Sequence, residues 1–233
     1  MDTFFSTLIN NNEIELSKSE SHHCIIVKRK KINDKVKVVD GNGYVYVSSI
    51  VNANKNCVIL KIEEKKKSLS PANNLHLVIS PTKSQDRIDW MVEKATEIGV
   101  EEITFLLCSR TERKKINLDR IKRISISALK QCGQAYLPKI NDIQEFRFVI
   151  ESIEANQKYI AHLEDDDNKV FLSKTYKSGK SSVIVIGPEG DFTKDEINIA
   201  KNNHFTPVTL GENTLRTETA GVYVSSLVNI LND

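Results

Sequence analysis

The sequence predicts a protein of class α/β in two parts, a small and mostly β unit over residues 1–70 and a mainly parallel α/β domain over residues 73–233. Three observations support this prediction. An alternating apolar and polar pattern surrounds a glycine turn near residue 41, apolar strands alternate with amphipathic helices after residue 75, and a charged, then Ser-, Pro- and Asn-rich stretch at 65–74 separates the two patterns. We expect that stretch to be a linker, with the boundary near residue 70.

The N-terminal unit is predicted mainly from a hairpin. Residues 36–40 and 44–50 alternate apolar with polar side chains on either side of Gly41-Asn42-Gly43, a pattern typical of two strands joined by a tight turn. A further β-rich run covers residues 57–62. Ser17 and Glu20 have the spacing of a capping box, so we expect a short helix to begin there.

The C-terminal domain is predicted from alternating periodicities. Short apolar runs indicate strands at 75–79, 103–107, 159–163, 183–186 and 207–210. Apolar residues at helical spacing indicate helices over 88–98, 118–132 and 194–201, and another after Arg216, while Gly99 ends the first of them. Strands that alternate with helices favour a parallel sheet with helices on both faces.

Composition excludes several other classes of protein. With 233 residues, of which 39% are hydrophobic and 27% charged, the chain matches an ordinary globular protein rather than a disordered one. No apolar run approaches the ~18 residues needed to cross a bilayer. Residues 1–5 also lack the basic and apolar regions of a signal peptide, so we expect a cytoplasmic protein with no membrane partner.

Metal chemistry and the common nucleotide motifs are not predicted. The cysteines form no C-x-x-C pair, His22 and His23 are adjacent, and the other histidines are isolated, so no convergent set of metal ligands is visible. The G-x-G-x-x-G and G-x-x-x-x-G-K-[ST] motifs are absent as well. We therefore expect no metal in the functional site.

The net charge of +2 hides an uneven distribution. Residues 1–70 carry 12 basic against 8 acidic side chains, residues 71–150 carry 13 against 10, and residues 151–233 carry 8 against 13. Two basic clusters, at 28–31 and 110–123, lie in the net-positive portion and suit contacts with nucleic-acid phosphates. We expect Lys28, Arg29, Arg110 and Arg113 to contact nucleic-acid phosphates, although such runs are also typical of solvated surfaces.

Two loops at the ends of predicted strands are candidates for a ligand site, because ligands of parallel sheets bind at the carboxyl ends of the strands. The strand 183–186 runs into Gly187-Pro188-Glu189-Gly190, where the glycines would let a ligand approach the backbone and Pro188 would restrict the turn. The alternative is a plain turn before a helix capped by Thr193 and Glu196.

The second loop follows the strand 207–210 and covers residues 211–220. Gly211 ends the strand, and Arg216 precedes a helix with a polar start and an apolar body. Taken alone, Thr217 would be a helix N-cap and Arg216 a surface residue. Because both loops follow strands of one sheet, we expect them to form a single pocket.

These residues resemble a known family. The segments 186–190, 210–211 and 215–220 resemble, in order and spacing, the ribosomal RNA small-subunit methyltransferase E family, which methylates N3 of a uridine in 16S rRNA. Further segments that resemble the family are Lys83, 88–100, 109–113, 128–138, 19–23 and 39–43. The resemblance implies a PUA-like RNA-binding β-barrel, a SPOUT domain with a trefoil knot, the methyl donor S-adenosylmethionine, a homodimer, and the small ribosomal subunit or its 16S rRNA as partner.

The resemblance also implies the site residues. The donor-binding set is Leu163, Ile186, Gly187, Pro188, Glu189, Gly190, Leu210, Gly211, Leu215, Arg216 and Thr219. Uridine N3 must lose a proton before it can attack a methyl group, so Arg216 is the first candidate to stabilise the resulting anion. Glu189 is the second catalytic candidate, as a proton acceptor or as an anchor for a ligand.

The chain departs from the family pattern at four positions. Asp191 stands where the family commonly has a glycine, Asn213 and Thr214 replace an Arg-Ile pair, and Gln134 stands where an arginine is common. These changes affect details of the pocket and of RNA binding. Two alternative functions stay open, a SPOUT methyltransferase that acts on transfer RNA and an RNA-binding relative without catalytic activity.

Overall fold

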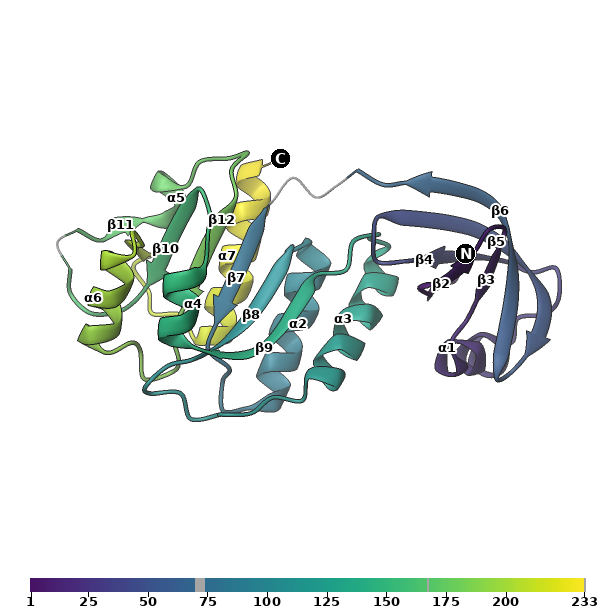
Figure 1. Cartoon of the computed structure of the whole chain (residues 1–233), viewed down its shortest axis with the longest axis horizontal. Coiled ribbons are helices and arrows are strands. Elements are labelled where there is room, and N and C mark those ends of the chain that lie inside the picture. Colours follow the sequence, from purple (N-terminus) through teal and green to yellow (C-terminus); the bar gives the residue numbers. More distant parts are fainter. Residues whose placement is uncertain (70–73, 167, 233) are drawn as a thin grey trace. The chain divides into compact units, whose positions relative to one another are not determined.

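The computed structural model describes residues 1–69, 74–166 and 168–232, and it divides into two units (Figure 1). The N-terminal unit comprises residues 1–70 together with 126–137, and the C-terminal unit comprises 71–125 and 138–233. Helix α3 (Leu118–Cys132) therefore begins in one unit and ends in the other. The sequence pattern gave no sign that residues 126–137 belong with the N-terminal unit.

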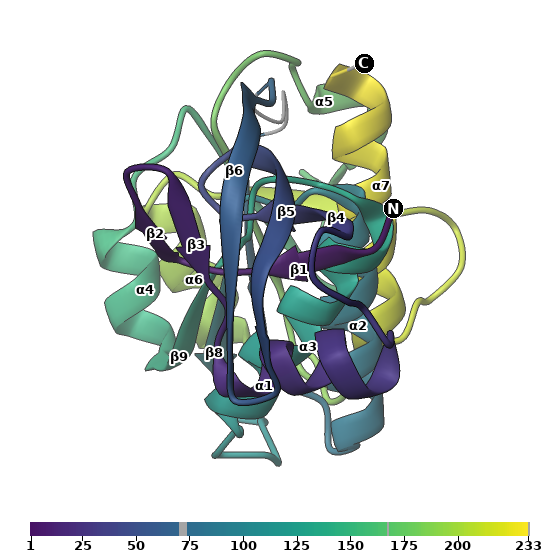
Figure 2. The ribbon, with the colours of Figure 1, turned by 90° about the vertical axis from the view of Figure 1, so that its right-hand side faces the viewer.

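The N-terminal unit is built on a six-stranded sheet with the order β1-β4-β5-β6-β3-β2 (Figure 2). Its strands are β1 (Thr3–Phe5), β2 (Leu8–Asn10), β3 (Glu13–Glu15), β4 (Lys35–Val39), β5 (Tyr44–Asn54) and β6 (Cys57–Lys67). β4 and β5 pair antiparallel around the turn 41–43, which confirms the predicted hairpin. The sheet curls around a core that includes Phe4, Ile14, Val38 and Leu60.

The predicted linker over 65–74 includes residues that belong to a strand. β6 continues to Lys67, which pairs with Tyr44 of β5, so residues 65–67 belong to the sheet. Lys65 also places its ammonium 4.2 Å from the centre of the Tyr44 ring, a favourable cation–π contact. The lysine run thus forms one end of a strand, and the part of the expected linker at 70–73 lies outside the described residues.

Helix α1 (Lys18–His22), which continues into a π-helical turn at His23–Val27, forms where the sequence predicts a short helix. Ser17 caps it by accepting a hydrogen bond from the N–H of Glu20. The other half of the expected capping box is absent, because the Glu20 carboxylate accepts from the N–H of Phe5 at 3.0 Å and binds Lys130 at 2.6 Å. Glu20 therefore ties β1 to the segment 126–137.

The C-terminal unit contains a seven-stranded parallel sheet with the order β11-β13-β10-β12-β7-β8-β9. Its strands are β7 (Leu75–Ile79), β8 (Glu102–Leu107), β9 (Lys139–Glu145), β10 (Gln157–Ala161), β11 (Val170–Phe171), β12 (Ser182–Ile186) and β13 (Thr206–Thr209). The predicted parallel sheet is confirmed, and β9 and β11 are additional to the predicted strands. Two late strands lie between earlier ones, since β12 separates β10 from β7 and β13 separates β11 from β10.

Helices cover both faces of this sheet (Figure 1). The helices other than α3 are α2 (Gln85–Ile98), α4 (Phe146–Ser152), α5 (Leu172–Thr175), α6 (Lys194–Asn202) and α7 (Thr217–Asn232). Alternate strand residues point to opposite faces, so Ile184 packs in the core with α2 and α7, whereas Val183 and Val185 pack with α4 and α6. This two-sided burial explains why the strands read as continuous apolar runs.

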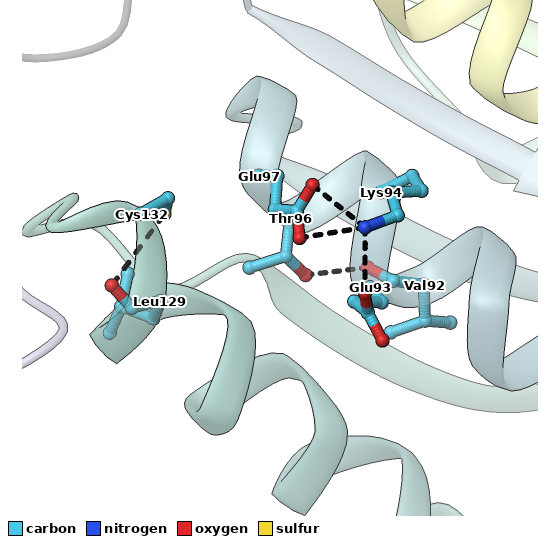
Figure 3. A network of polar contacts seen from close by, with 7 residues as sticks. All are labelled: Val92, Glu93, Lys94, Thr96, Glu97, Leu129 and Cys132. Atoms are coloured by element: carbon cyan, nitrogen blue, oxygen red, sulfur yellow. Dashed lines mark hydrogen bonds and ion pairs between the residues drawn. The ribbon is translucent and has the colours of Figure 1, made fainter.

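Polar contacts join side chains in the second half of α2, which belongs to the family-like segment 88–100 (Figure 3). Lys94 lies between the carboxylates of Glu93 and Glu97, at 2.7 and 2.9 Å. The hydroxyl of Thr96 donates to the carbonyl of Val92 at 2.7 Å, and Gly99 closes the helix in the left-handed conformation with φ of 92°. Within the described residues, no helix has the length and apolar character needed to span a membrane.

The glycine turn of the N-terminal hairpin packs against the segment 126–137. Gly43 donates its N–H to the carbonyl of Ala135 at 2.9 Å, and Leu137 donates to the carbonyl of Gly41 at 2.9 Å. A Cβ atom at Gly43 would lie 2.3 Å from the Tyr136 ring, and φ at Gly43 is 95°. The turn therefore needs glycine both for its backbone angle and for the approach of the tyrosine.

Gly43→Ala should lower the free energy of unfolding by more than about 2 kcal/mol, because it combines left-handed strain with displacement of Tyr136. Gly179→Ala is the matched control, since φ there is 73° and no described residue other than its chain neighbours lies within 4 Å of the added Cβ. The control substitution should lower the free energy of unfolding by only about 1 kcal/mol. Urea unfolding measures both, and equal losses would show that the Tyr136 contact contributes nothing.

Candidate functional site

A cavity of about 400 Å³ lies at the carboxyl ends of β10, β12 and β13. Three chain segments line it, namely 161–163 with Lys169, 186–189 with Asp191, and 208–217 with Ala220. β10 is the immediate neighbour of both other strands, so the three strand ends meet at one edge of the sheet. The two loops singled out in the sequence thus contribute to a single cavity.

The first loop is a tight turn packed on an aromatic ring. Asp191 donates its N–H to the carbonyl of Pro188 at 2.9 Å. A Cβ atom at Gly187 would lie 2.9 Å from the buried Phe192 ring, and one at Gly190 would lie 3.4 Å from Arg110. A side chain at Gly187 would therefore collide with Phe192, whereas a Cβ atom at Gly190 would make only an ordinary contact with Arg110, and the expectation that these glycines admit a ligand stays a prediction.

A buried hydrogen bond joins the first loop to the second. Thr217 is the first residue of α7, and its hydroxyl donates to the carbonyl of Gly187 at 3.1 Å. Thr217 thus lies inside the helix rather than at the N-cap position before it. The contact fixes the start of α7 against the end of β12, and with it the position of Arg216 beside the cavity.

The segment after β8 braces the first loop. Arg110 Nη1 donates to the carbonyls of Gly190 and Phe192, at 2.7 and 3.3 Å. Ser109 donates its N–H to the Glu196 carboxylate at 2.8 Å, and the same carboxylate completes the predicted capping box of α6. Arg110, which the sequence assigns to RNA, is thus engaged with the backbone of the loop.

The segment after β7 is held in a similar way. Glu189 Oε1 accepts from the N–H of Lys83 at 3.0 Å. Arg113 Nε donates to the carbonyls of Thr82 and Lys83, at 3.1 and 3.2 Å. The second arginine assigned to RNA therefore also has backbone partners, and Glu189 connects two loops of the same sheet edge.

Most of the residues that the resemblance assigns to the donor line the cavity. These are Leu163, Ile186, Gly187, Pro188, Glu189, Leu210, Gly211, Leu215 and Arg216. Gly190 and Thr219 do not belong to the lining. Arg216 is exposed, and its side chain has no hydrogen bond or ion pair in the described part of the chain. Among the described residues, a Cβ atom at Gly211 would meet nothing within 4 Å beyond its chain neighbours, so open space adjoins the backbone there.

His162, Lys169 and Asp191 are among the polar lining residues that the sequence analysis did not assign to the donor. His162 is only 5% exposed, and neither ring nitrogen has a hydrogen-bond partner among the described residues. Burial lowers the pKa of His162 below its ordinary value. Its place at the end of the predicted strand 159–163 was the one sequence signal for it.

The cavity lining combines apolar side chains with charges of both signs. Ile186, Val208 and Leu215 supply apolar surface, while Arg216 and Asp191 carry opposite charges. No group of three or more potential metal-ligating side chains occurs within the described ranges of the chain. The arrangement suits an organic ligand that has both an apolar part and charged groups.

Comparison with protein families identifies both units. The model of an RNA methyltransferase domain matches residues 69–229, and that of an RNA methyltransferase PUA domain matches residues 16–63. The ribosomal RNA small subunit methyltransferase E of Buchnera aphidicola is 31% identical over 94% of this chain and 88% of its own length. The chain therefore belongs to the ribosomal RNA small subunit methyltransferase E family, which confirms the resemblance, and it is an RNA methyltransferase.

Solved structures agree with this assignment. A structure from Porphyromonas gingivalis, described as a probable rRNA-methyltransferase, is 32% identical, with a TM-score of 0.92, and covers 100% of this chain and 98% of its own. The ribosomal RNA small subunit methyltransferase E of Neisseria gonorrhoeae, solved with S-adenosyl methionine bound, is 26% identical, with a TM-score of 0.88 over 100% of this chain and 98% of its own. The predicted pairing of a PUA-like unit with an α/β domain is thereby confirmed.

His162 should make the protein less stable in acid. In the folded protein the pKa of His162 is lowered. At a pH below the ordinary histidine pKa of about 6.5, the unfolded chain therefore binds more protons than the folded chain. Stability should therefore fall as the pH drops through that value. Thermal midpoints between pH 7.5 and pH 5 should fall less for His162→Gln than for the wild type.

The exposed His204 provides the control, with His204→Asn because asparagine tolerates its φ of 66°. His204→Asn should keep the wild-type dependence on pH. His76 has a pKa lowered by burial as well, so part of the dependence should persist in His162→Gln. Identical profiles for wild type and His162→Gln would remove His162 as a cause.

Proposed function

We propose that this protein transfers a methyl group from S-adenosylmethionine to N3 of a uridine in the 16S rRNA of the small ribosomal subunit. The observation that carries the proposal is the cavity at the ends of three adjacent strands. Nine of the eleven residues that the resemblance assigns to donor binding belong to its lining. Family membership and the donor bound to the Neisseria gonorrhoeae relative support the same function.

The residues of the cavity fit such a donor. Its volume of about 400 Å³ falls in the range of small-molecule sites. Apolar side chains could hold an uncharged ring system, and charges of both signs suit a zwitterionic group. When bound, the donor supplies an activated methyl group on a sulfonium, so the protein has to hold the acceptor in line with it and exclude water.

Arg216 suits the stabilisation of charge on the acceptor base. Uridine N3 becomes nucleophilic only when it loses its proton, and the neighbouring carbonyl oxygens then carry negative charge. Arg216 lines the cavity, precedes the first turn of α7 and has no partner among the described residues, so its donors stay available. The positive end of the helix dipole favours an anion at the same place.

Glu189 is the second polar group of the proposed mechanism. One carboxylate oxygen accepts from the N–H of Lys83, which keeps the side chain beside the first loop. The other oxygen has no hydrogen bond within the described residues. Glu189 would thus accept a proton or anchor a ligand through Oε2 while Oε1 keeps the two loops together.

The N-terminal unit would bind the RNA. Arg29 is exposed at φ of 53° and makes no hydrogen bond or ion pair in the part of the chain that is described. Lys28 and Lys30 hold Asp2 between them at 2.9 Å each and lower the pKa of that carboxyl to about 2. Lys28 is therefore partly neutralised, and Arg29 is the more available contact for a phosphate.

Family membership also supports a trefoil knot, a homodimer and a cytoplasmic location. The insertion of β12 and β13 between earlier strands is compatible with a threaded chain. On α2 and α7, Trp90 and Tyr223 are 43% and 38% exposed, which suits burial against a second copy. Sedimentation that gives only a monomer at micromolar concentration would contradict the dimer.

The proposed activity can be tested directly. The purified protein should transfer label from S-adenosylmethionine to small-subunit rRNA, and nucleoside analysis should yield 3-methyluridine as the product. Transfer RNA in a parallel reaction should stay unlabelled. Label in transfer RNA alone would favour the first alternative function, and donor binding or RNA binding without transfer would favour the non-catalytic one.

Arg216→Ala should slow methyl transfer by about 10²-fold or more, as the removal of one oxyanion donor does elsewhere, with little change in donor affinity. Arg216→Lys should restore only part of the rate, because an ammonium lacks the planar fork of a guanidinium. Single-turnover kinetics at saturating donor and RNA measures this step. A near-normal rate for Arg216→Ala would remove the residue from the mechanism.

The double variant Lys28→Gln with Arg29→Gln should weaken RNA binding. It should also reduce the steepness with which the logarithm of the RNA association constant falls against the logarithm of the salt concentration. The expected reduction is about 0.7–0.9 for each phosphate that the two side chains neutralise in the wild type. The exposed Lys180 of the C-terminal unit supplies the control variant Lys180→Gln. Arg110 and Arg113 are poor choices for this test, because their replacement would also disturb the loops at the cavity. An unchanged salt slope would show that residues 28 and 29 are merely solvated.

A further inference from the structure

The segment after β10 forms one wall of the cavity with little apolar support. His162, Leu163 and Lys169 of this segment line the cavity, and the Leu163 side chain is 58% exposed. Most of the described residues between Leu163 and Lys169 are polar or charged. A wall of this kind must be held by hydrogen bonds and ion pairs, since hydrophobic burial contributes little to it.

Both polar groups of the Leu163 residue are bound by charged side chains. Its N–H donates to Asp191 Oδ2 at 2.9 Å, and its carbonyl lies 3.5 Å from the Lys169 ammonium. The same ammonium donates to the carbonyls of His162 and Glu164, at 3.3 and 2.9 Å. One lysine therefore satisfies three successive carbonyls, and one aspartate fixes the amide between them.

Asp191 occupies a backbone conformation that favours glycine. Its φ is 59°, in the left-handed region, and its N–H closes the turn with the carbonyl of Pro188. A residue with a side chain in this conformation carries a cost that glycine avoids. The carboxylate here links the loop after β12 to the loop after β10, a contact that glycine could not make.

We propose that Asp191 and Lys169 are positioning residues for the methyl donor, which together hold the backbone of residues 162–164 in place as a wall of the cavity before the donor binds. This inference rests on the proposed function. A wall that is already ordered costs less conformational entropy on binding, so the two side chains raise donor affinity without having to touch the donor.

The test uses the full chain and compares Asp191→Gly with Asp191→Asn. Calorimetry should show that Asp191→Gly weakens the binding of S-adenosylmethionine and of S-adenosylhomocysteine by about 10-fold, which corresponds to the cost of ordering about one residue of backbone on binding. Its thermal midpoint should change little, because the relief of left-handed strain offsets the lost hydrogen bond. Asn keeps an acceptor and tolerates the conformation, so Asp191→Asn should stay within about 3-fold of the wild type.

Lys169→Met should weaken donor binding to a similar degree, and the exposed Lys180→Met should leave it unchanged. NMR-detected hydrogen exchange without donor gives a second readout. The Leu163 amide should exchange faster in Asp191→Gly than in the wild type, while the amides of β10 should keep their protection.

The outcomes separate this inference from the proposed function. A wild-type protein that binds neither donor nor product would contradict the proposed function. Normal donor binding in Asp191→Gly, or an unchanged Leu163 amide, would overturn the positioning role alone. A parallel loss of thermal stability and affinity in Asp191→Gly would make the residue merely structural and would also overturn it.

Discussion

The parallel pairing of β10 with both β12 and β13 is the constraint on which the cavity depends. Ala161, the last residue of β10, pairs with Ile186 of β12 and with Val208 of β13. The three following loops therefore leave the sheet at nearly the same level, although they are far apart in the sequence. Because β12 and β13 are the last two strands in the described part of the chain, the cavity needs strands from its C-terminal third in place beside β10.

Polar contacts then fix the loops that this sheet brings together. Backbone carbonyls in the loops that follow the strands have no hydrogen-bond partner in the sheet, so each needs a donor from elsewhere. Thr217 supplies one to Gly187, Arg110 supplies one to Gly190, and Lys169 supplies three to the segment after β10. Several charged residues around the cavity thus act on the protein's own backbone, which keeps the loops in one arrangement.

The sequence predicted those features that local patterns determine. Buried strands and amphipathic helices have distinct periodicities, so the parallel sheet and the two loops at its edge could be recognised. The reason that position 187 requires glycine could not be recognised, since it depends on the packing of Phe192 against the turn. Residues 126–137 join the N-terminal unit through contacts such as that between Glu20 and Lys130, which are 110 residues apart and leave no periodic signal. The donor and the target base came from the family resemblance and not from the pattern.

Positive charge in the sequence does not reveal which of the basic donors are already engaged within the protein. Arg110 and Arg113 donate to loop carbonyls, and Lys28 shares Asp2 with Lys30. Arg29 and Arg216 have the same formal charge but no partner among the described residues. A guanidinium that must break a hydrogen bond to a carbonyl before it binds a phosphate gains less binding free energy than one that only gives up bound water. The availability of their donors therefore separates Arg29 and Arg216 from the two arginines that hold the loops of the site.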